Sequence, residues 1–150
     1  MSTRTFDRVA IVLGLVAVVI AAYLTVIHYE EDLLVCSVVH GCATVQASSY
    51  ATVGPVPVAL LGLAASVTMV GIAVWRMTST TNRFMASAMI TGMLFTALLY
   101  LGYLTYLEIF VIEAICQWCV AYLIVSAIWF ALEAWGLWNG MSADDLAFED

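Results

Sequence analysis

Four long apolar stretches constrain the fold of this chain more than any other feature. A helix needs about 20 mostly apolar residues to cross the hydrocarbon layer of a bilayer. Four stretches approach or exceed that length: about Val9 to Ile27, Val56 to Trp75, Phe84 to Leu107 and Cys116 to Trp138. Because unpaired backbone polar groups cannot face lipid, each stretch is expected to be a helix. The sequence therefore predicts an all-α bundle of four membrane-spanning helices, formed by residues 1–150 as one domain.

The composition supports a membrane protein and excludes some other classes. Hydrophobic residues make up 65% of the chain and charged residues 10%, which is far less charge than a soluble domain carries. The four basic residues are not clustered as in a nucleic-acid-binding patch, so we expect no nucleic-acid partner. Arg4 and Arg8 precede the first apolar stretch as in a signal peptide. That stretch is too long for a signal and lacks a small-residue cleavage site, so we expect a retained first span.

The arginines also predict how the chain is oriented. Arg4 and Arg8 precede the first span, and Arg76 and Arg83 lie between the second and the third. The connections over residues 28–55 and 108–115 contain no Arg or Lys. Since basic residues are retained on the cytoplasmic side, we expect both termini inside the cell and these two connections outside. The predicted location is the cell membrane, with lipid around a multi-pass bundle.

All four cysteines fall on the predicted outer side. Cys36 and Cys42 lie in the loop after the first span, and Cys116 and Cys119 form a Cys-x-x-Cys motif at the start of the last span. Such a motif is typical of a zinc site, a redox centre or a structural link. Five residues separate the upstream pair, a looser spacing than zinc sites usually have, so we expect no metal. Two structural disulfides in a non-catalytic membrane protein remain an alternative, because the outer side is oxidising.

A redox role has physical support in the Cys-x-x-Cys pair. If a helix begins near Cys116, the positive end of its dipole stabilises the thiolate of that residue. Cys119 is three residues further on, on the same face and about one turn deeper, so the two sulfurs can cycle between dithiol and disulfide. A sulfur at that depth can meet a lipid-soluble two-electron oxidant such as a quinone. His28 and His40 both lie outside the predicted spans, where a haem within the bundle would not find them, and no Rossmann glycine pattern is present.

The rest of the outer loop suggests two further local structures. Residues 43–53 alternate apolar and small polar side chains, which is typical of a short interfacial helix or a covered loop. The run Gly54-Pro55-Val56-Pro57 predicts a turn before the second span. Within the spans, close helix packing is expected at small residues, for which the candidates are Gly62, Gly71, Gly92 and Gly102.

Two segments of the chain, taken together, carry a family resemblance. The first is Cys36-Ser37-Val38-Val39-His40-Gly41-Cys42-Ala43-Thr44-Val45-Gln46-Ala47-Ser48-Ser49-Tyr50, followed by Gly54-Pro55-Val56-Pro57 and Leu61-Gly62. The second is Cys116-Gln117-Trp118-Cys119 at the head of the last span. Together these segments resemble the vitamin K epoxide reductase family, and the resemblance covers about residues 9–138. The disulfide bond protein B type, another four-helix family linked to quinones, has its cysteine pairs in the reverse order.

The resemblance implies a role for each cysteine. Cys36 corresponds to the loop cysteine that exchanges with a thioredoxin-fold partner, and Cys42 to the cysteine that passes the disulfide to Cys116. Cys119 corresponds to the sulfur that faces the quinone. Ser48 matches a loop Ser or Thr of the family that assists quinone chemistry or holds the loop. Since the chain has no fused thioredoxin-like domain, the partner is expected to be a separate protein.

Two departures from the animal members bear on the substrate. Animal members have an Asn at the start of the second span, where this chain reads Pro57-Val58-Ala59. They have a Tyr four residues after the motif, where this chain has Leu123, with Tyr122 one place earlier. The expected activity is therefore quinone reduction coupled to disulfide formation, with a ubiquinone, menaquinone or vitamin K type of quinone and Tyr122 as a hydrogen-bond donor to it. Reduction of vitamin K epoxide itself is the alternative within the enzyme class.

Overall fold

The computed structural model describes residues 3–30, 41–78 and 83–147. Its long helices are α1 (Thr3–Tyr29), α3 (Val58–Thr78), α4 (Arg83–Phe110) and α5 (Gln117–Ala147). All four are long and apolar enough to cross a membrane, which confirms the predicted four-helix architecture. The helices extend a few residues beyond most of the predicted spans, because polar end residues continue a helix into the headgroup layer. Helix α3 begins two residues later than predicted, since Val56 and Pro57 form a strand, and α5 begins one residue later than predicted, at Gln117.

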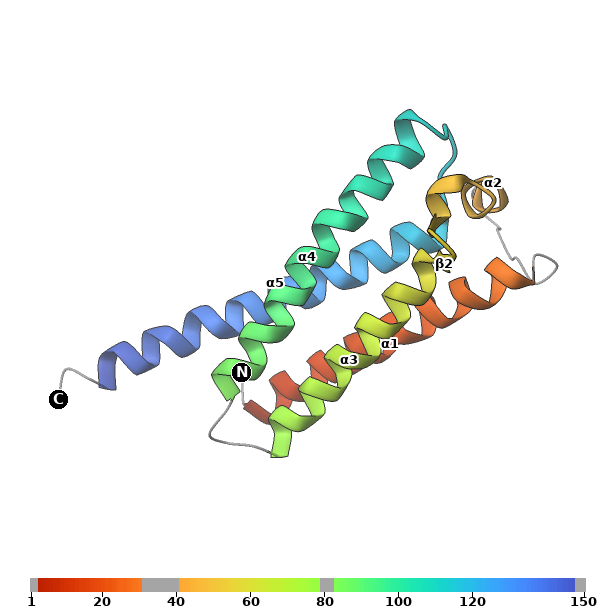
Figure 1. Ribbon diagram of the computed structural model, residues 1–150. Coiled ribbons are helices and arrows are strands. Elements are labelled where there is room, and N and C mark those ends of the chain that lie inside the picture. Colours follow the sequence, from red (N-terminus) through yellow and green to blue (C-terminus); the bar gives the residue numbers. More distant parts are fainter. Residues whose placement is uncertain (1–2, 31–40, 79–82, 148–150) are drawn as a thin grey trace.

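The four helices form a ring in which each packs most extensively against two others. Helix α1 packs against α3 and α5, and α4 packs against the same two helices from the other side. Both ends of the chain lie at one end of the bundle, and the short helix α2 (Cys42–Gln46) lies at the opposite end (Figure 1). This arrangement places the start of α5 beneath the loop that follows α1.

The distribution of polarity in the bundle is the inverse of that in a soluble protein. Large apolar side chains in the middle of the helices are exposed, among them Val19 (67% exposed) and Leu99 (62% exposed). Charged side chains are buried instead: Asp7, Arg76, Glu108 and Glu133. An exposed apolar surface around buried charges is stable in lipid, where charge is tolerated only when it is paired inside the bundle.

A buried network of charges joins all four helices at the end that carries the termini. The guanidinium of Arg76 on α3 donates to Asp7 on α1 (3.0 Å) and to Glu133 on α5 (2.6 Å). It also donates to the hydroxyl of Ser87 on α4 (2.8 Å). Arg83 bonds the same Asp7 carboxylate at 2.9 Å. Two positive charges thus match two negative ones. From the sequence, both arginines were expected only to mark the orientation of the chain, and the structure gives them a packing role as well.

The loop between α1 and α3 is compact where the structure describes it. Helix α2 is followed by a 3-10 turn (Ser49–Ala51) and by a hairpin of two short antiparallel strands, β1 (Thr52–Val53) and β2 (Val56–Pro57). Gly54 occupies the hairpin turn with a φ of 61°, a conformation that favours glycine. The predicted turn is therefore present. Of the segment 43–53, where a short helix was one of two expectations, only the first residues are α-helical, because α2 ends at Gln46. Cys36 and His40 lie outside the described residues.

Helices come closest at two glycines that were not among the predicted positions. A side chain at Gly14 would lie 2.7 Å from the ring of Trp129, and one at Gly136 would lie 2.6 Å from the ring of Phe6. The expectation was wrong for Gly71, Gly92 and Gly102, where nothing in the described structure lies within 4 Å of an added Cβ. A small residue permits close packing, but a neighbouring helix must also be present on that face. Gly62 does face another helix, with the Tyr122 hydroxyl at an ordinary contact distance of 3.5 Å.

Candidate active site

The loop between α4 and α5 folds back over the end of α4 and presents Cys116. The amides of Ile112 and Ala114 donate to the carbonyls of Leu107 (2.8 Å) and Glu108 (3.0 Å), and Glu113 adopts a positive φ of 53°. Cys116 directly precedes α5, and its carbonyl accepts the bond from Val120 N at 3.1 Å. Cys116 therefore caps the helix, as expected from the sequence.

The two motif sulfurs lie together as free thiols. Cys116 is fully buried and Cys119 is partly buried. The pKa of Cys116 is lowered from its ordinary value, first by the hydrogen bond with the Cys119 side chain and then by the backbone amides of Cys119 and Trp118. Burial and the negative charge of Glu108 oppose this effect. The backbone contribution is that of a helix N-terminus, so Cys116 has the character of an attacking thiolate.

Cys42 lies in the same buried cluster as Cys116 and Tyr122. It is disulfide-bonded and completely buried, and it is the first residue of α2. The preceding Gly41 sets the position of α2, because a Cβ there would lie 2.7 Å from both the backbone N and the backbone O of Ile115. The chain that leads into Cys42 thus touches the chain that leads into Cys116. The structure brings together Cys42, Cys116 and Cys119 of the four predicted cysteines; the role of Cys36 stays a prediction.

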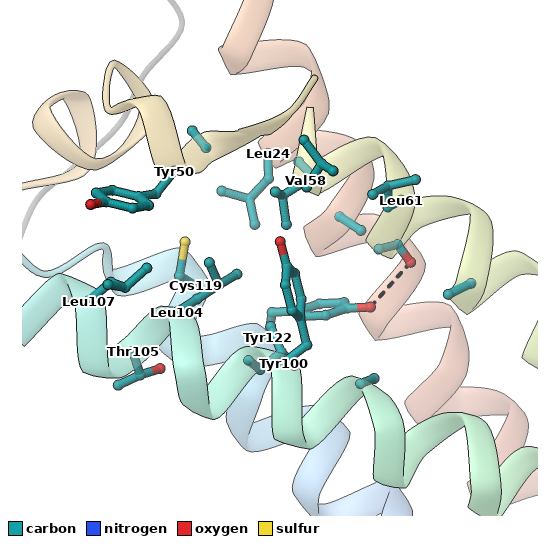
Figure 2. Close-up of a pocket in the computed structure, with 18 of the residues that line it drawn as sticks. Leu24, Tyr50, Val58, Leu61, Tyr100, Leu104, Thr105, Leu107, Cys119 and Tyr122 are labelled. Carbon is teal, nitrogen blue, oxygen red and sulfur yellow. Dashed lines mark hydrogen bonds between the residues drawn. The ribbon is translucent and has the colours of Figure 1, made fainter. Parts of the chain in front are cut away.

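An apolar cavity of about 860 Å³ opens beside Cys119. Its walls come mainly from α3 and α4, and α2 with the turn that follows it covers one end. In Figure 2 the Cys119 sulfur and the ring of Tyr100 point into this space, with Leu24 and Val58 on its far side. Several wall residues are also exposed on the outer surface of the bundle, including Leu61 and Met89. The cavity therefore connects the motif cysteines to the lipid-facing side of α3 and α4.

The two predicted quinone-binding residues line the cavity, but their hydroxyl groups have partners. Ser48 donates to the carbonyl of Val45 at 2.7 Å. The Tyr122 hydroxyl shares a 2.8 Å bond with Ser66 and donates to the carbonyl of Gly62 at 3.2 Å (Figure 2). Both residues shape the wall, and their role as donors to a ligand stays a prediction.

Sequence reasoning missed two polar side chains of the cavity, Tyr100 and Glu108. In the part of the chain that the structure describes, the Tyr100 hydroxyl has no hydrogen-bond partner. Glu108 is 3% exposed, and its Oε2 accepts a bond from the backbone N–H of Cys116 at 3.1 Å. An acidic residue at the end of an apolar stretch was a signal for Glu108. For Tyr100 there was none, because interfacial tyrosines are common.

Possible metal ligands do not cluster in the described ranges, where no group of three or more His, Cys, Asp or Glu side chains converges. Two free thiols, Cys116 and Cys119, lie beside the disulfide-bonded Cys42, an arrangement suited to thiol–disulfide exchange. A model of the vitamin K epoxide reductase family matches residues 8–134.

The chain belongs to this family. The match extends from α1 to α5 and includes every cysteine, so it confirms the resemblance drawn from the two cysteine segments. No curated protein gives a match to the chain. Membership of the vitamin K epoxide reductase family, together with four membrane-spanning helices, identifies a multi-pass membrane oxidoreductase.

Proposed function

We propose that the protein oxidises the thiols of a separate thioredoxin-fold protein outside the cytoplasm and passes the electrons to a membrane quinone. The observation that carries this proposal is the position of the Cys116–Cys119 pair. One side of the pair contacts the buried cluster that holds Cys42, and the other side borders an apolar cavity open to lipid. Such a pair can receive electrons from a thiol and deliver them to a lipid-soluble acceptor.

The proposed relay has three exchange steps. The partner's dithiol reduces a disulfide between Cys36 and Cys42 and is itself oxidised. Cys42 then attacks a Cys116–Cys119 disulfide and forms a mixed disulfide with Cys116. Cys36 attacks Cys42 in turn, so that the Cys36–Cys42 disulfide forms again and the Cys116–Cys119 pair returns to two free thiols. In the last step an S–S bond forms between Cys116 and Cys119, and two electrons and two protons pass to the quinone, which leaves as quinol. The net reaction consumes one dithiol and one quinone and yields one disulfide and one quinol.

The cavity suits a quinone as the electron-accepting substrate. Its volume lies within the range of small-molecule sites, about 300–1,000 Å³, and its lining is almost entirely apolar. An isoprenoid tail can leave between α3 and α4 toward lipid, while the ring lies against Cys119. The Tyr100 hydroxyl points into the space (Figure 2) and is the group best placed to donate a hydrogen bond to a quinone oxygen.

Two observations favour this proposal over its rivals. Cys116 and Cys119 are free thiols, whereas a protein with two structural disulfides would hold both pairs bonded. The animal Asn and Tyr positions are occupied by other residues in this chain, which favours quinone over an epoxide. The arginine distribution supports an orientation with the termini in the cytoplasm and the cysteines outside.

Glycine variants test the quinone site directly. Gly92 lines the cavity and Gly71 does not, and both have open space around an added Cβ. Leucine at position 92 extends into the cavity, so Gly92→Leu should raise the KM for quinone at least tenfold. Gly71→Leu should leave KM unchanged. Anaerobic turnover is followed by quinone absorbance, with a reduced thioredoxin-fold protein as the electron donor. Equal KM values for the two variants would exclude the cavity as the quinone site.

A further inference from the structure

Among the described residues, Glu108 is an acidic side chain that contacts both motif cysteines. It lies near the C-terminal end of α4, is almost completely buried and lines the cavity beside Cys119. Burying a carboxylate costs free energy unless hydrogen bonds satisfy it. Glu108 has two such partners: the backbone N–H of Cys116 at 3.1 Å and the side chain of Cys119. One carboxyl group therefore touches both motif cysteines and faces the proposed quinone site.

The quinone reaction moves protons as well as electrons. Oxidation of Cys116 and Cys119 releases two protons, and reduction of a quinone to a quinol consumes two. Cys116 lies at the N-terminus of α5, where the helix favours a thiolate, and Cys119 lies deeper and lines the cavity. The proton of Cys119 is therefore the one that must leave within the apolar site. Water cannot collect that proton from an apolar cavity without a polar path. A carboxyl group within hydrogen-bond reach of the sulfur can, since general acid–base catalysis requires such contact.

We propose that Glu108 is the proton-transfer residue of the quinone reaction, a role that rests on the proposed function. Its carboxylate accepts the Cys119 proton as the S–S bond to Cys116 forms and two electrons pass to the quinone. The carboxylic acid then donates that proton to a quinone oxygen. The quinol takes its second proton from water on the side of the α4–α5 loop. This proton balances the one that Cys116 gives up to water when it becomes a thiolate.

The surroundings of Glu108 leave few competitors for this role. The other titratable groups that line the cavity are Cys119 and the tyrosines Tyr50, Tyr100 and Tyr122. No second carboxylate and no cation lines it among the described residues. The tyrosines lack a hydrogen bond to either motif sulfur in the part of the chain that the structure describes. Among the described titratable side chains that line the cavity, Glu108 alone contacts both Cys119, the proton donor, and the space that the acceptor would occupy.

The test compares Glu108→Gln with Glu113→Gln in a single turnover. Glutamine keeps an oxygen that accepts the Cys116 N–H but cannot exchange a proton. Glu113, the control position, is exposed and lies in the loop between α4 and α5. Chemically reduced protein in detergent is mixed anaerobically with one equivalent of a short-chain quinone, and quinol is followed by absorbance from pH 5 to 9. Glu108→Gln should slow quinol formation about 100-fold and abolish the pH dependence attributable to this group, while Glu108→Asp retains part of the rate. Glu113→Gln should match the wild type.

A second measurement separates proton transfer from a structural defect. Iodoacetamide alkylation of Cys116, read by mass spectrometry, reports whether its helix-cap site is intact. We expect Glu108→Gln to be alkylated at least as fast as the wild type, because the opposing negative charge is removed. A wild-type rate of quinol formation in Glu108→Gln would overturn the inference. So would a Glu108→Gln protein that has lost both Cys116 alkylation and quinol formation, because the defect would then be structural. A wild-type protein that forms no quinol would instead refute the proposed function.

Discussion

The contact at Gly41 allows the coupling between Cys42 and Cys116 to be tested by a single methyl group. Gly41 has φ −85° and ψ −7°, which alanine adopts without strain. Any effect of Gly41→Ala therefore comes from the added Cβ. That atom would lie 2.7 Å from the Ile115 backbone, whereas ordinary contact begins at 3.4 Å. Two backbone segments must separate by several tenths of an ångström or more, because no flexible side chain can move aside.

The separation moves Cys42 away from Cys116, and thiol–disulfide exchange needs direct contact between the sulfurs. A misplacement of about 1 Å can cost about 100-fold in rate, so we expect Gly41→Ala to slow partner-driven quinone reduction between about 10-fold and 100-fold. Dithiothreitol reduces the Cys116–Cys119 disulfide without Cys42, so its rate should stay within about twofold of wild type. The assay is anaerobic stopped-flow with each donor, and Gly71→Ala is the control. An unchanged partner-driven rate, or an equal fall with both donors, would refute the reasoning.

Three further predictions concern other parts of the molecule. Arg76→Met leaves a buried carboxylate unpaired, so it should lower the free energy of unfolding by about 3–5 kcal/mol, measured by titration with SDS in mixed micelles. Arg83→Met, at a site one-third exposed, should lower it by about 1 kcal/mol or less. Equal losses in the two variants would contradict the network. Cys119→Ala removes the main cause of the lowered Cys116 pKa, so this pKa should rise and the thiolate fraction at a given pH should fall. The pH profile of Cys116 alkylation should then move to higher pH. An unmoved profile would show that the helix end alone sets the pKa. Tyr100→Phe should raise the KM for quinone several-fold without changing alkylation of Cys116, and a KM equal to that of the wild type would remove this hydroxyl from the site.

The fold was predictable because the membrane imposes it. A span must be about 20 apolar residues long and must be helical, so the length and hydropathy of the apolar stretches were enough to locate four helices. The position of Cys116 at a helix N-terminus was equally accessible, since the motif stands at the boundary between a loop and an apolar stretch. The meeting of Cys42 with Cys116 required the order of the helices in the ring and was supported in advance only by the family resemblance.

The contents of the bundle interior were not predictable from the same patterns. Asp7, Arg76 and Glu133 are distant in sequence, and no local signal pairs them. Glu108 appears in the sequence as an ordinary polar end of a span, and its turn toward Cys116 depends on the loop over residues 111–116 that folds back. The cavity likewise arises from the packing of α3 against α4. These features depend on tertiary contacts rather than on periodicity or composition.

The most direct test of the central claim is the stoichiometry of one turnover. Fully reduced protein in detergent is mixed anaerobically with one equivalent of quinone, and both quinol absorbance and the disulfides, mapped by mass spectrometry, are recorded. We predict one quinol per protein, a new Cys116–Cys119 disulfide, and neither product in Cys119→Ala. Quinol formation that persists in Cys119→Ala, or a Cys116–Cys119 disulfide that forms without quinol, would contradict the proposed path of electrons.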